Sequence, residues 1–460
     1  MNRIRHGLSA VLTRYFSGES ISYQAVFALL LPVVVDQFFL IGFNFINTAM
    51  ISSSGQADIS AVNIVGSLNI LLVQVFVSIG LGGTVLMAQY YGRGSHSMLG
   101  EVCNGSLYGT VIVAIIVAVT LVLFHNPILH LLFGPASALV MTNARLYIVG
   151  IMFSYPAEAV IESTNGCLRG IGRTKISLQL SLMMNSIYLA FNFLFVTALN
   201  YGVVGLAISL NISRWCIAGF AIFTLYRERS LFSLSFKTLK HANLFMIKRV
   251  LTVSVPFAAE SVFFNGGKVI MQMMIVMLGT SVVAANAIAG SWIQLSEIIP
   301  TALGTSLVPI VGQCIGRKNM KDARKLTRSF VGLGSILFIL VDLTLLPLYP
   351  IGIQLFHPSK AIISLVFQIF IVALVMHFLS WSVSFVLPSA LRAAGDAKFT
   401  TIVSLLSMWC FRIGGGYVVG IVLSYGLIGI FVVMCLEWSL RGTIFILRFK
   451  GQRWLQHNLI

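Results

Sequence analysis

PVVVD (Pro32–Asp36) and PFAAE (Pro256–Glu260) lie in two apolar segments of this chain, 224 residues apart. In each of them a proline precedes an acidic residue by four positions inside a long hydrophobic run. Two more pairs repeat at nearly the same spacing: QYYGR (Gln89–Arg93) with QCIGR (Gln313–Arg317), and LRGIG (Leu168–Gly172) with LRAAG (Leu391–Gly395). Three such pairs in register indicate that the chain consists of two similar halves.

The composition is that of a membrane protein. Hydrophobic residues make up 58% of the chain, charged residues only 9%, and the mean hydropathy is +0.94, which excludes an ordinary soluble domain. Apolar stretches of about 20 residues, long enough to cross the hydrocarbon core of a bilayer, recur along the whole sequence. We predict twelve spanning helices, at about 24–50, 60–90, 102–124, 143–165, 175–199, 203–226, 250–277, 282–314, 329–347, 361–388, 399–422 and 427–447.

These helices predict the fold class. It is an all-α polytopic membrane protein, with twelve transmembrane helices in two pseudo-symmetric six-helix lobes around a central cleft. Residues 1–226 form the predicted N-lobe, residues 227–248 a cytoplasmic linker, and residues 249–460 the C-lobe. The linker mixes Ser, Phe and Lys, so it is either a short amphipathic helix at the lipid headgroups or a plain tether.

The net charge of +17 is unevenly distributed. If the N-terminus is cytoplasmic, most Lys and Arg residues fall on the cytoplasmic side, and the outer connections hold only Arg145 and Lys360. This follows the positive-inside rule and favours an inner (plasma) membrane protein with both termini cytoplasmic. The charge therefore indicates a lipid bilayer rather than a nucleic acid as partner. The polar, basic residues 1–20 lack the apolar core of a cleavable signal peptide.

Signals for an enzyme or a metal site are absent from the sequence. The six cysteines lie in or near apolar segments and form no C-x-x-C pair, so we interpret them as small core residues. No G-x-x-x-x-G-K-[ST] motif is present, so ATP does not drive transport from this chain. We expect no enzymatic activity, no metal and no cofactor other than H⁺ or Na⁺ as a coupling ion.

Several motifs resemble the multidrug and toxic compound extrusion (MATE) family, in its bacterial type. They are Ala61–Ile64, Gln89–Gly94 and Leu168–Lys175, followed by their counterparts Gly279–Ala289, Gly312–Gln313 and Leu391–Lys398. The resemblance covers essentially the whole chain. It implies a twelve-helix bundle of two lobes that uses entry of H⁺ or Na⁺ to expel amphipathic, often cationic compounds.

The chain departs from the pattern of this family at three positions. Bacterial members typically have an Asp before a Thr near the end of the first helix, where this chain has Asn47 and Thr48. A second Asp of the family, in the fifth helix, corresponds to Asn192, and the acidic residue of Na⁺-coupled relatives in the tenth helix corresponds to Trp381. The usual assignment of the ion site does not transfer to these residues.

Asp36 is the first candidate for a proton-coupling residue. A charge inside a spanning helix costs about 2.5–3.5 kcal/mol on insertion scales, so it should face the protein interior. On a helical wheel Asp36 shares a polar stripe with Asn44, Asn47 and Thr48. Low dielectric favours the neutral carboxyl and so permits proton exchange near neutral pH. Pro32 is the predicted hinge one turn earlier; the alternative is a permanently hydrogen-bonded structural acid.

Glu260 and Glu297 are the corresponding candidates in the second half. Glu260 follows a second predicted hinge, Pro256, and is either a site for protons or cationic substrates or a member of a structural salt bridge. Glu297 lies on a polar face of the eighth helix and would attract a cation. Lys268 is eight residues beyond Glu260, too far round the helix for tight pairing.

The remaining polar groups are predicted to line the cleft between the lobes, with hydrogen bonding between helices as the alternative. Glu158, Glu162 and Arg169 favour a structural ion network, and His377 is either a titrating group or a core histidine. The predicted lining residues are Asn44, Asn47, Asn63, Gln74, Asn192, Lys268, Asn286, Gln294 and His377.

The sequence therefore predicts a cation-coupled antiporter that exports small amphipathic, cationic compounds by alternating access, with H⁺ favoured over Na⁺. We expect a monomer whose partners are a small-molecule substrate and the bilayer. One alternative is a lipid-linked saccharide flippase of the same superfamily, which would need a strongly cationic cavity for pyrophosphate. Another is a channel or a membrane scaffold that does not transport.

Overall fold

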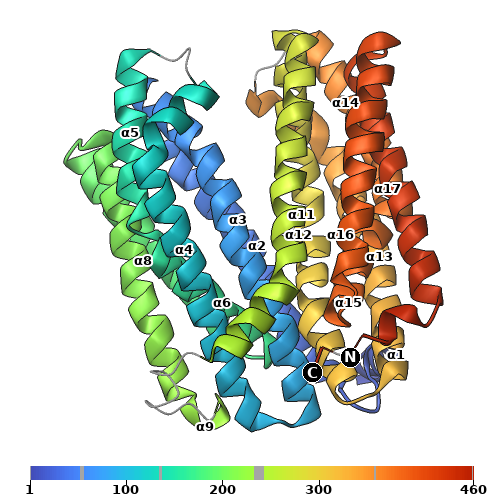
Figure 1. Cartoon of the computed structure of the whole chain (residues 1–460). Helices are drawn as coiled ribbons and strands as arrows, with labels where there is room; N and C mark the ends of the chain where they lie inside the picture. Colours follow the sequence, from blue (N-terminus) through green and yellow to red (C-terminus); the bar gives the residue numbers. More distant parts are fainter. Residues whose placement is uncertain (1, 52–55, 134–136, 233–242, 357–358, 458) are drawn as a thin grey trace. The chain divides into compact units, whose positions relative to one another are not determined.

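A computed structural model of the chain describes all residues except 1, 52–55, 134–136, 233–242, 357–358 and 458, and these described residues are almost entirely helical (Figure 1). The first half contains α1 (Asn2–Phe16), α2 (Tyr23–Ile51), α3 (Gln56–Arg93), α4 (His96–Phe133), α5 (Ala138–Met152), α6 (Tyr155–Gly170), α7 (Thr174–Asn192), η1 (Phe193–Ala198), α8 (Gly202–Arg227) and α9 (Arg229–Phe232). Within the described part of the chain there is no β-strand.

The second half repeats this order of long helices. It contains α11 (Leu244–Met277), α12 (Thr280–Gly316), α13 (Met320–Gly352), η2 (Ile353–Phe356), α14 (Lys360–Met376), η3 (His377–Val386), α15 (Leu387–Ala393), α16 (Ala397–Leu406), η4 (Ser407–Gly415), η5 (Val418–Val422), α17 (Gly426–Lys450) and η6 (Arg453–Leu455). The segments η1, η3, η4 and η5 are π-helical, while η2 and η6 are short 3₁₀ turns.

The spanning segments match the predicted ones. In the described chain, ten helices are long and apolar enough to cross a membrane, and the pair α5–α6, bent by 50°, adds an eleventh. The remaining predicted span is α11, whose 34 residues are also long enough to cross but include four charged side chains between Lys248 and Lys268. The all-α, twelve-helix fold class is confirmed.

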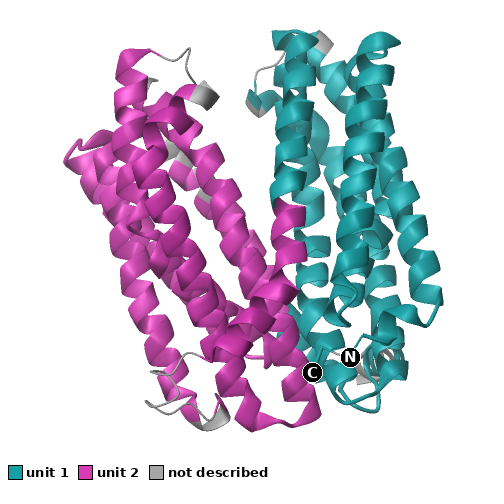
Figure 2. Cartoon of the chain, in the orientation of Figure 1, with its two compact units in different colours: residues 1–30, 262–460 teal, residues 31–261 magenta. Residues whose placement is uncertain are grey.

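The chain divides into two compact units. Unit 1 comprises residues 1–30 and 262–460, and unit 2 comprises residues 31–261 (Figure 2). The division falls inside α2, next to Pro32, and inside α11, after Ser261. The predicted lobes instead follow the repeat, so their boundaries stay a prediction. In the predicted linker, α9 is a single helical turn, and residues 233–242 lie outside the described part.

Each unit has its own apolar core. In unit 2 the core gathers side chains of α3, α4, α5, α6 and α8 around buried residues such as Phe76, Tyr147 and Tyr155. In unit 1 the core gathers α11, α12, α13, α14 and α17 around Trp292 and Phe370.

Close contacts between helices in unit 2 depend on residues with small side chains or none. A Cβ atom on Gly80 of α3 would stand 2.7 Å from the carbonyl oxygen of Glu162 in α6, so only glycine fits. Next to it, the Thr84 hydroxyl donates a 2.9 Å hydrogen bond to the carbonyl oxygen of Gly166. Small residues let backbones approach in this way in many membrane bundles.

The sequence repeat is also a repeat of the backbone. Gly172 and Gly395, at the turns after α6 and α15, both have a positive φ (86° and 99°). In each turn the next residue donates its N–H to the leucine carbonyl that opens the motif, at 2.8 Å from Arg173 and 3.0 Å from Asp396. The arginines also correspond: Arg169 donates to Ser177 at 3.2 Å, and Arg392 donates to Thr400 at 3.3 Å.

Both chain termini meet the same end of unit 1 (Figure 1). Lys325, in the first turns of α13, donates to the Ser17 carbonyl oxygen at 2.6 Å, and Arg324 donates to the Gly451 carbonyl oxygen at 2.9 Å. Asp322 accepts from the backbone N–H of Ser20 at 2.7 Å. The two ends of the chain therefore lie on one side, at the basic start of α13.

Candidate transport site

Asp36 is buried in unit 2, with 5% of its surface exposed. Its Oδ2 lies 3.8 Å from Nη2 of Arg169, and the Ser181 side chain of α7 is within hydrogen-bonding reach. Its Oδ1 is buried and has no hydrogen-bond partner among the described residues. A carboxylate held by one distant guanidinium, with one oxygen unsatisfied, has room to accept a proton.

The predicted hinges do not interrupt their helices here. Helix α2 continues through Pro32 from Tyr23 to Ile51, and α11 continues through Pro256 from Leu244 to Met277. Proline removes one backbone hydrogen bond even in a continuous helix, so both positions stay points where bending costs less. Their role as hinges stays a prediction.

Two of the three positions at which the chain departs from the family pattern, Asn47 and Asn192, are in contact in unit 2. The Asn192 amide, fully buried in α7, donates a 2.8 Å hydrogen bond to the side-chain oxygen of Asn47 in α2. The Tyr188 hydroxyl is within reach of both asparagines. A pair of neutral amides thus stands at two positions where the resemblance led us to expect carboxylates. The side chains of Asn44 and Thr48, predicted to share this stripe, lie outside the described residues.

The predicted polar face of α3 divides into two parts. Asn63 and Gln74 are exposed within their unit, as lining residues should be. Ser78, one turn after Gln74, is instead buried and shares a 2.9 Å hydrogen bond with Ser261 of α11. Glu260, next to Ser261, is half-buried. The polar face of α3 is therefore exposed within its unit at Asn63 and Gln74, and it packs against α11 from Ser78 onward.

The acidic group of α12 is paired in unit 1. Oε1 of the half-buried Glu297 accepts a 2.9 Å hydrogen bond from Nε1 of Trp381 in η3. Glu297 also interacts electrostatically with Lys268 of α11, whose ammonium lies 5.2 Å from the ring centre of Phe264. Trp381 is the third position at which the chain departs from the family pattern. It is not acidic itself but donates a hydrogen bond to the acidic Glu297.

The other lining residues predicted in unit 1 differ in burial. Gln294 is exposed, and the half-buried Asn286 donates to Oε1 of Gln272 at 3.3 Å. His377 is fully buried, and its Nδ1 lies 3.3 Å from Oδ2 of Asp342 in α13. Whether these residues line a cleft stays a prediction, because burial within unit 1 does not test it.

Two buried ion clusters have partners that the sequence did not identify. In the predicted network, Glu162 interacts electrostatically with Glu158 and Arg169, and Oε2 of Glu158 in α6 also lies 3.0 Å from Nε of Arg214 in α8. In unit 1, Glu437 of α17 pairs with Arg412 of η4 and with Arg441, the latter at 3.3 Å. Charges placed deep inside apolar helices were the available signal, but the sequence could not show which partners meet.

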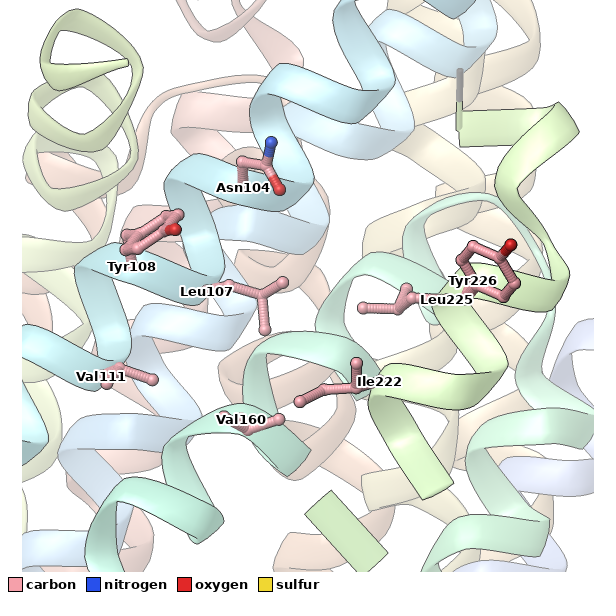
Figure 3. A pocket seen from close by; sticks show the side chains of 8 residues that line it. All are labelled: Asn104, Leu107, Tyr108, Val111, Val160, Ile222, Leu225 and Tyr226. Carbon is pink, nitrogen blue, oxygen red and sulfur yellow. The ribbon is translucent and has the colours of Figure 1, made fainter. Parts of the chain in front are cut away.

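Two grooves occur on unit 2, between α4, α6 and α8. Figure 3 shows one of about 230 Å³, lined by Asn104, Leu107, Tyr108, Val111, Val160, Ile222, Leu225 and Tyr226. The second, of about 390 Å³, is lined by apolar side chains of the same helices together with Met152 and Phe153 of the α5 end. Neither groove contains a predicted coupling or lining residue, and their apolar walls suit lipid chains.

Within the described residues, no three His, Cys, Asp or Glu side chains are grouped so that they could hold a metal ion. Several polar clusters among the described residues are carboxylates paired with arginine, lysine, histidine or tryptophan. Such clusters can take up, release or move protons, or shift a charge between two arrangements.

Comparison with known proteins gives the same two-part pattern. The MatE family model matches residues 32–194 and 256–418, two stretches of equal length whose starts are 224 residues apart. They begin at the two prolines of the repeat. This confirms the resemblance drawn from the motifs and the duplication of the chain.

Relatives match over nearly their full length. An uncharacterized transporter of Bacillus subtilis, YisQ, is 24% identical over 441 residues, which are 95% of this chain and 96% of that protein. A probable multidrug resistance protein of Oceanobacillus iheyensis, NorM, is 22% identical over 394 residues, 85% of this chain and 88% of that protein.

Solved structures share the fold. An outward-facing multidrug resistance MATE family transporter of the MOP superfamily matches with a TM-score of 0.85 at 15% identity, over 94% of this chain and 96% of that chain. The bent form of the Vibrio cholerae MATE transporter VcmN matches with a TM-score of 0.84 at 17% identity, over 97% and 98%. Since the family model covers well over half of its residues, this chain belongs to the MatE family of multi-pass membrane transporters.

Proposed function

We propose that this transporter is a cation-coupled antiporter that exports small amphipathic, cationic compounds, with H⁺ as the coupling ion. The observation that carries the proposal is Asp36, a buried carboxylate in a spanning helix with one unsatisfied oxygen. Protonation would remove its charge and weaken its attraction to Arg169. A coupling ion acts by binding one conformation better than another, and Asp36 next to Pro32 can supply that difference.

The surroundings of Asp36 favour H⁺ over Na⁺. A sodium ion needs several oxygen ligands, and the cation nearest to Asp36 is the Arg169 guanidinium at 3.8 Å, which also interacts electrostatically with Glu162. A bound Na⁺ would be repelled by this cation, whereas a proton neutralises Asp36 without adding a net positive charge. The amide pair Asn47–Asn192 further lowers the number of anionic oxygens in this part of unit 2.

The relatives' names support the class of substrate. Several are described as probable multidrug resistance proteins, and this chain offers acidic groups that suit cations, above all Glu297 and Glu260. Export by alternating access, an inner-membrane location with cytoplasmic termini, and a monomeric state belong to the same proposal. The positive-inside pattern and the shared side of the two termini support that orientation.

The saccharide flippase is disfavoured by the pairing of the intramembrane cations. Arg214 lies 3.0 Å from Glu158, and Arg412 pairs with Glu437, so neither presents a free positive charge for a pyrophosphate. Lys268 interacts with Glu297. A pyrophosphate carrier would need cations without such partners.

The test uses purified protein in proteoliposomes, with a pH gradient and a Na⁺ gradient imposed separately. A fluorescent cationic dye should leave against its gradient when H⁺ flows in and should not respond to Na⁺ alone. Asp36→Asn should abolish this transport, because an amide cannot exchange a proton. The matched control is Asp322→Asn, which removes a buried acid in the first turn of α13. Normal dye efflux by Asp36→Asn would exclude Asp36 from the mechanism.

A further inference from the structure

His377 and Asp342 form a dyad inside unit 1. Nδ1 of His377, the first residue of η3, lies 3.3 Å from Oδ2 of Asp342 in α13, and their side chains are 0% and 1% exposed. His377 Nε2 and Asp342 Oδ1 are both buried and have no hydrogen-bond partner in the described part of the chain. The two side chains therefore make one contact with each other, although together they could take part in at least four hydrogen bonds.

Aromatic rings surround this dyad. The His377 ring lies 4.6 Å from the Phe338 ring and is stacked on Trp438 at 5.9 Å, measured between ring centres. Trp381 packs edge-on against the same Phe338 at 5.0 Å. These rings exclude water, so a change of charge on the dyad is not screened by solvent.

The charged groups of the neighbouring helices are held by partners of their own. Glu297 of α12 accepts from Trp381, and Glu437 of α17 pairs with Arg441 and with Arg412 of η4. Arg392 of α15 donates to Thr400. On α13 the basic residues lie in the first turns, far from Asp342, and α14 has its lysine, Lys360, at the opposite end from His377.

The dyad belongs to one half of the duplicated chain. At the 223-residue offset of the turn after α6, His377 corresponds to Ser154, whose hydroxyl accepts from Arg214 at 2.7 Å. Asp342 corresponds to Ala118 or Val119, both apolar. The same fold packs in unit 2 without a titratable pair at this place. Helix packing alone therefore does not account for it.

We propose that His377 and Asp342 together are a proton-binding site of unit 1, separate from Asp36. With His377 neutral and Asp342 ionised the dyad carries one negative charge. One proton taken from water gives either an imidazolium beside a carboxylate or a neutral histidine beside a carboxylic acid, both without net charge.

The π-helical segment η3 connects this site to Glu297. It carries His377 at its start and, one turn on, Trp381, which holds the Glu297 carboxylate. π-Helical turns are less regular than α-helical ones and often occur at functional sites, where they can shift register. Loss of the proton from the dyad would therefore change how Trp381 presents Glu297. This last step rests on the proposed function, whereas proton binding by the dyad does not.

The test follows the imidazole signals of ¹⁵N-labelled histidine by NMR, in full-length protein in lipid nanodiscs from about pH 5 to 9, the range over which histidine changes charge. His377→Gln identifies the signal of His377 among the 8 histidines. We expect this signal to titrate, with a midpoint that moves by at least about one pH unit in Asp342→Asn because the neighbouring charge is lost. His125→Gln, which removes a histidine in α4, should leave it unchanged.

A His377 signal that stays constant over the whole pH range in the unaltered protein would overturn the proposal, since the dyad would then be a fixed structural pair. This result needs no variant to fold. Dye transport is measured in parallel. Titration without proton-driven efflux would contradict the proposed function and leave the dyad intact as a proton site. Proton-driven efflux without titration would overturn the dyad as a proton site and leave the proposed function intact.

Discussion

The two units place different chemistry on the same backbone. In unit 2, α6 and α8 meet through Ser154, Glu158 and Arg214, an ion pair with a hydroxyl partner. At the 223-residue offset, Ser154 and Glu158 correspond to His377 and Trp381, and an aromatic residue of α17, Trp438, stacks on His377. The turns that follow α6 and α15 are nevertheless the same in their hydrogen bonds and in their glycine conformation.

This difference shows which parts of the duplicated chain are constrained by folding. The turn after α6 and its counterpart after α15 keep a glycine of positive φ, Gly172 and Gly395, because a residue with a side chain would be strained there. Buried charges are not kept, since ion pairs inside apolar helices can be replaced when neighbouring side chains change with them. The units can therefore hold different proton or cation sites: Asp36 in unit 2, Glu297 and the His377–Asp342 dyad in unit 1.

The substitution expected to destabilise the protein most is in unit 2. Glu158→Gln leaves the buried Arg214 guanidinium without its counter-charge, and removing one partner of a buried pair costs about 3–5 kcal/mol. We expect a marked fall in thermal stability of the purified protein, measured by unfolding in detergent. The control is Glu228→Gln, whose partner Arg173 is largely exposed at 3.7 Å, a kind of pair worth only about 0–1 kcal/mol. Equal stability of the two variants would mean that Arg214 is satisfied by other groups.

Much of this fold could be predicted from the sequence, because a bilayer restricts the choice of structure. Apolar length predicts spanning helices, and the repeat of Pro32–Asp36 at Pro256–Glu260 predicts two halves with one architecture. Every predicted span corresponds to a helix or to a bent pair of helices. The 50° bend between α5 and α6 was not predicted, although Pro156 in the first turn of α6 was an available signal for a helix start.

The candidate site could be predicted only in part. Helical wheels place Asp36 and Asn47 on one stripe, but they describe one helix at a time. Which helix supplies Arg214 to Glu158, or Asp342 to His377, depends on packing between segments far apart in the chain. Asp342 in particular carries no distinguishing signal in the sequence, because an acid in a predicted spanning helix looks the same whether it faces lipid, solvent or a histidine.

A smaller effect is expected at the corresponding position of unit 1. Trp381→Phe keeps a ring that can pack on Phe338 and Phe385 but removes the N–H that donates to Glu297. A hydrogen bond to a charged group is worth about 1.5–3 kcal/mol, and the half-buried Glu297 can recover part of it from water. We therefore expect a stability loss near the lower end of that range, together with altered dye affinity in proteoliposomes.

The control for this variant is Trp409→Phe, at an exposed tryptophan that contacts Phe263 edge-on. It should change stability by no more than about 0.5 kcal/mol, as expected for a surface substitution. If Trp381→Phe were as harmful as Glu158→Gln, the aromatic cluster of unit 1 would be as strongly constrained as the ion pair of unit 2. The contrast between the two units would then fail.

The smallest effect concerns a turn in which the halves differ. Gly94, after α3, has φ of 77°, and its counterpart after α12 is Lys318 with φ of 58°. A side chain in this left-handed region costs about 1–2 kcal/mol, and a Cβ on Gly94 would meet no atom within 4 Å. Gly94→Ala should therefore lose about 1 kcal/mol through the backbone alone, and Lys318→Gly should gain a similar or smaller amount. A lower unfolding temperature for Gly94→Ala and a higher one for Lys318→Gly would show that the backbone of Lys318 is strained, a strain that glycine avoids at position 94. A lower unfolding temperature for both variants would show that the side-chain contacts of Lys318 outweigh its backbone strain.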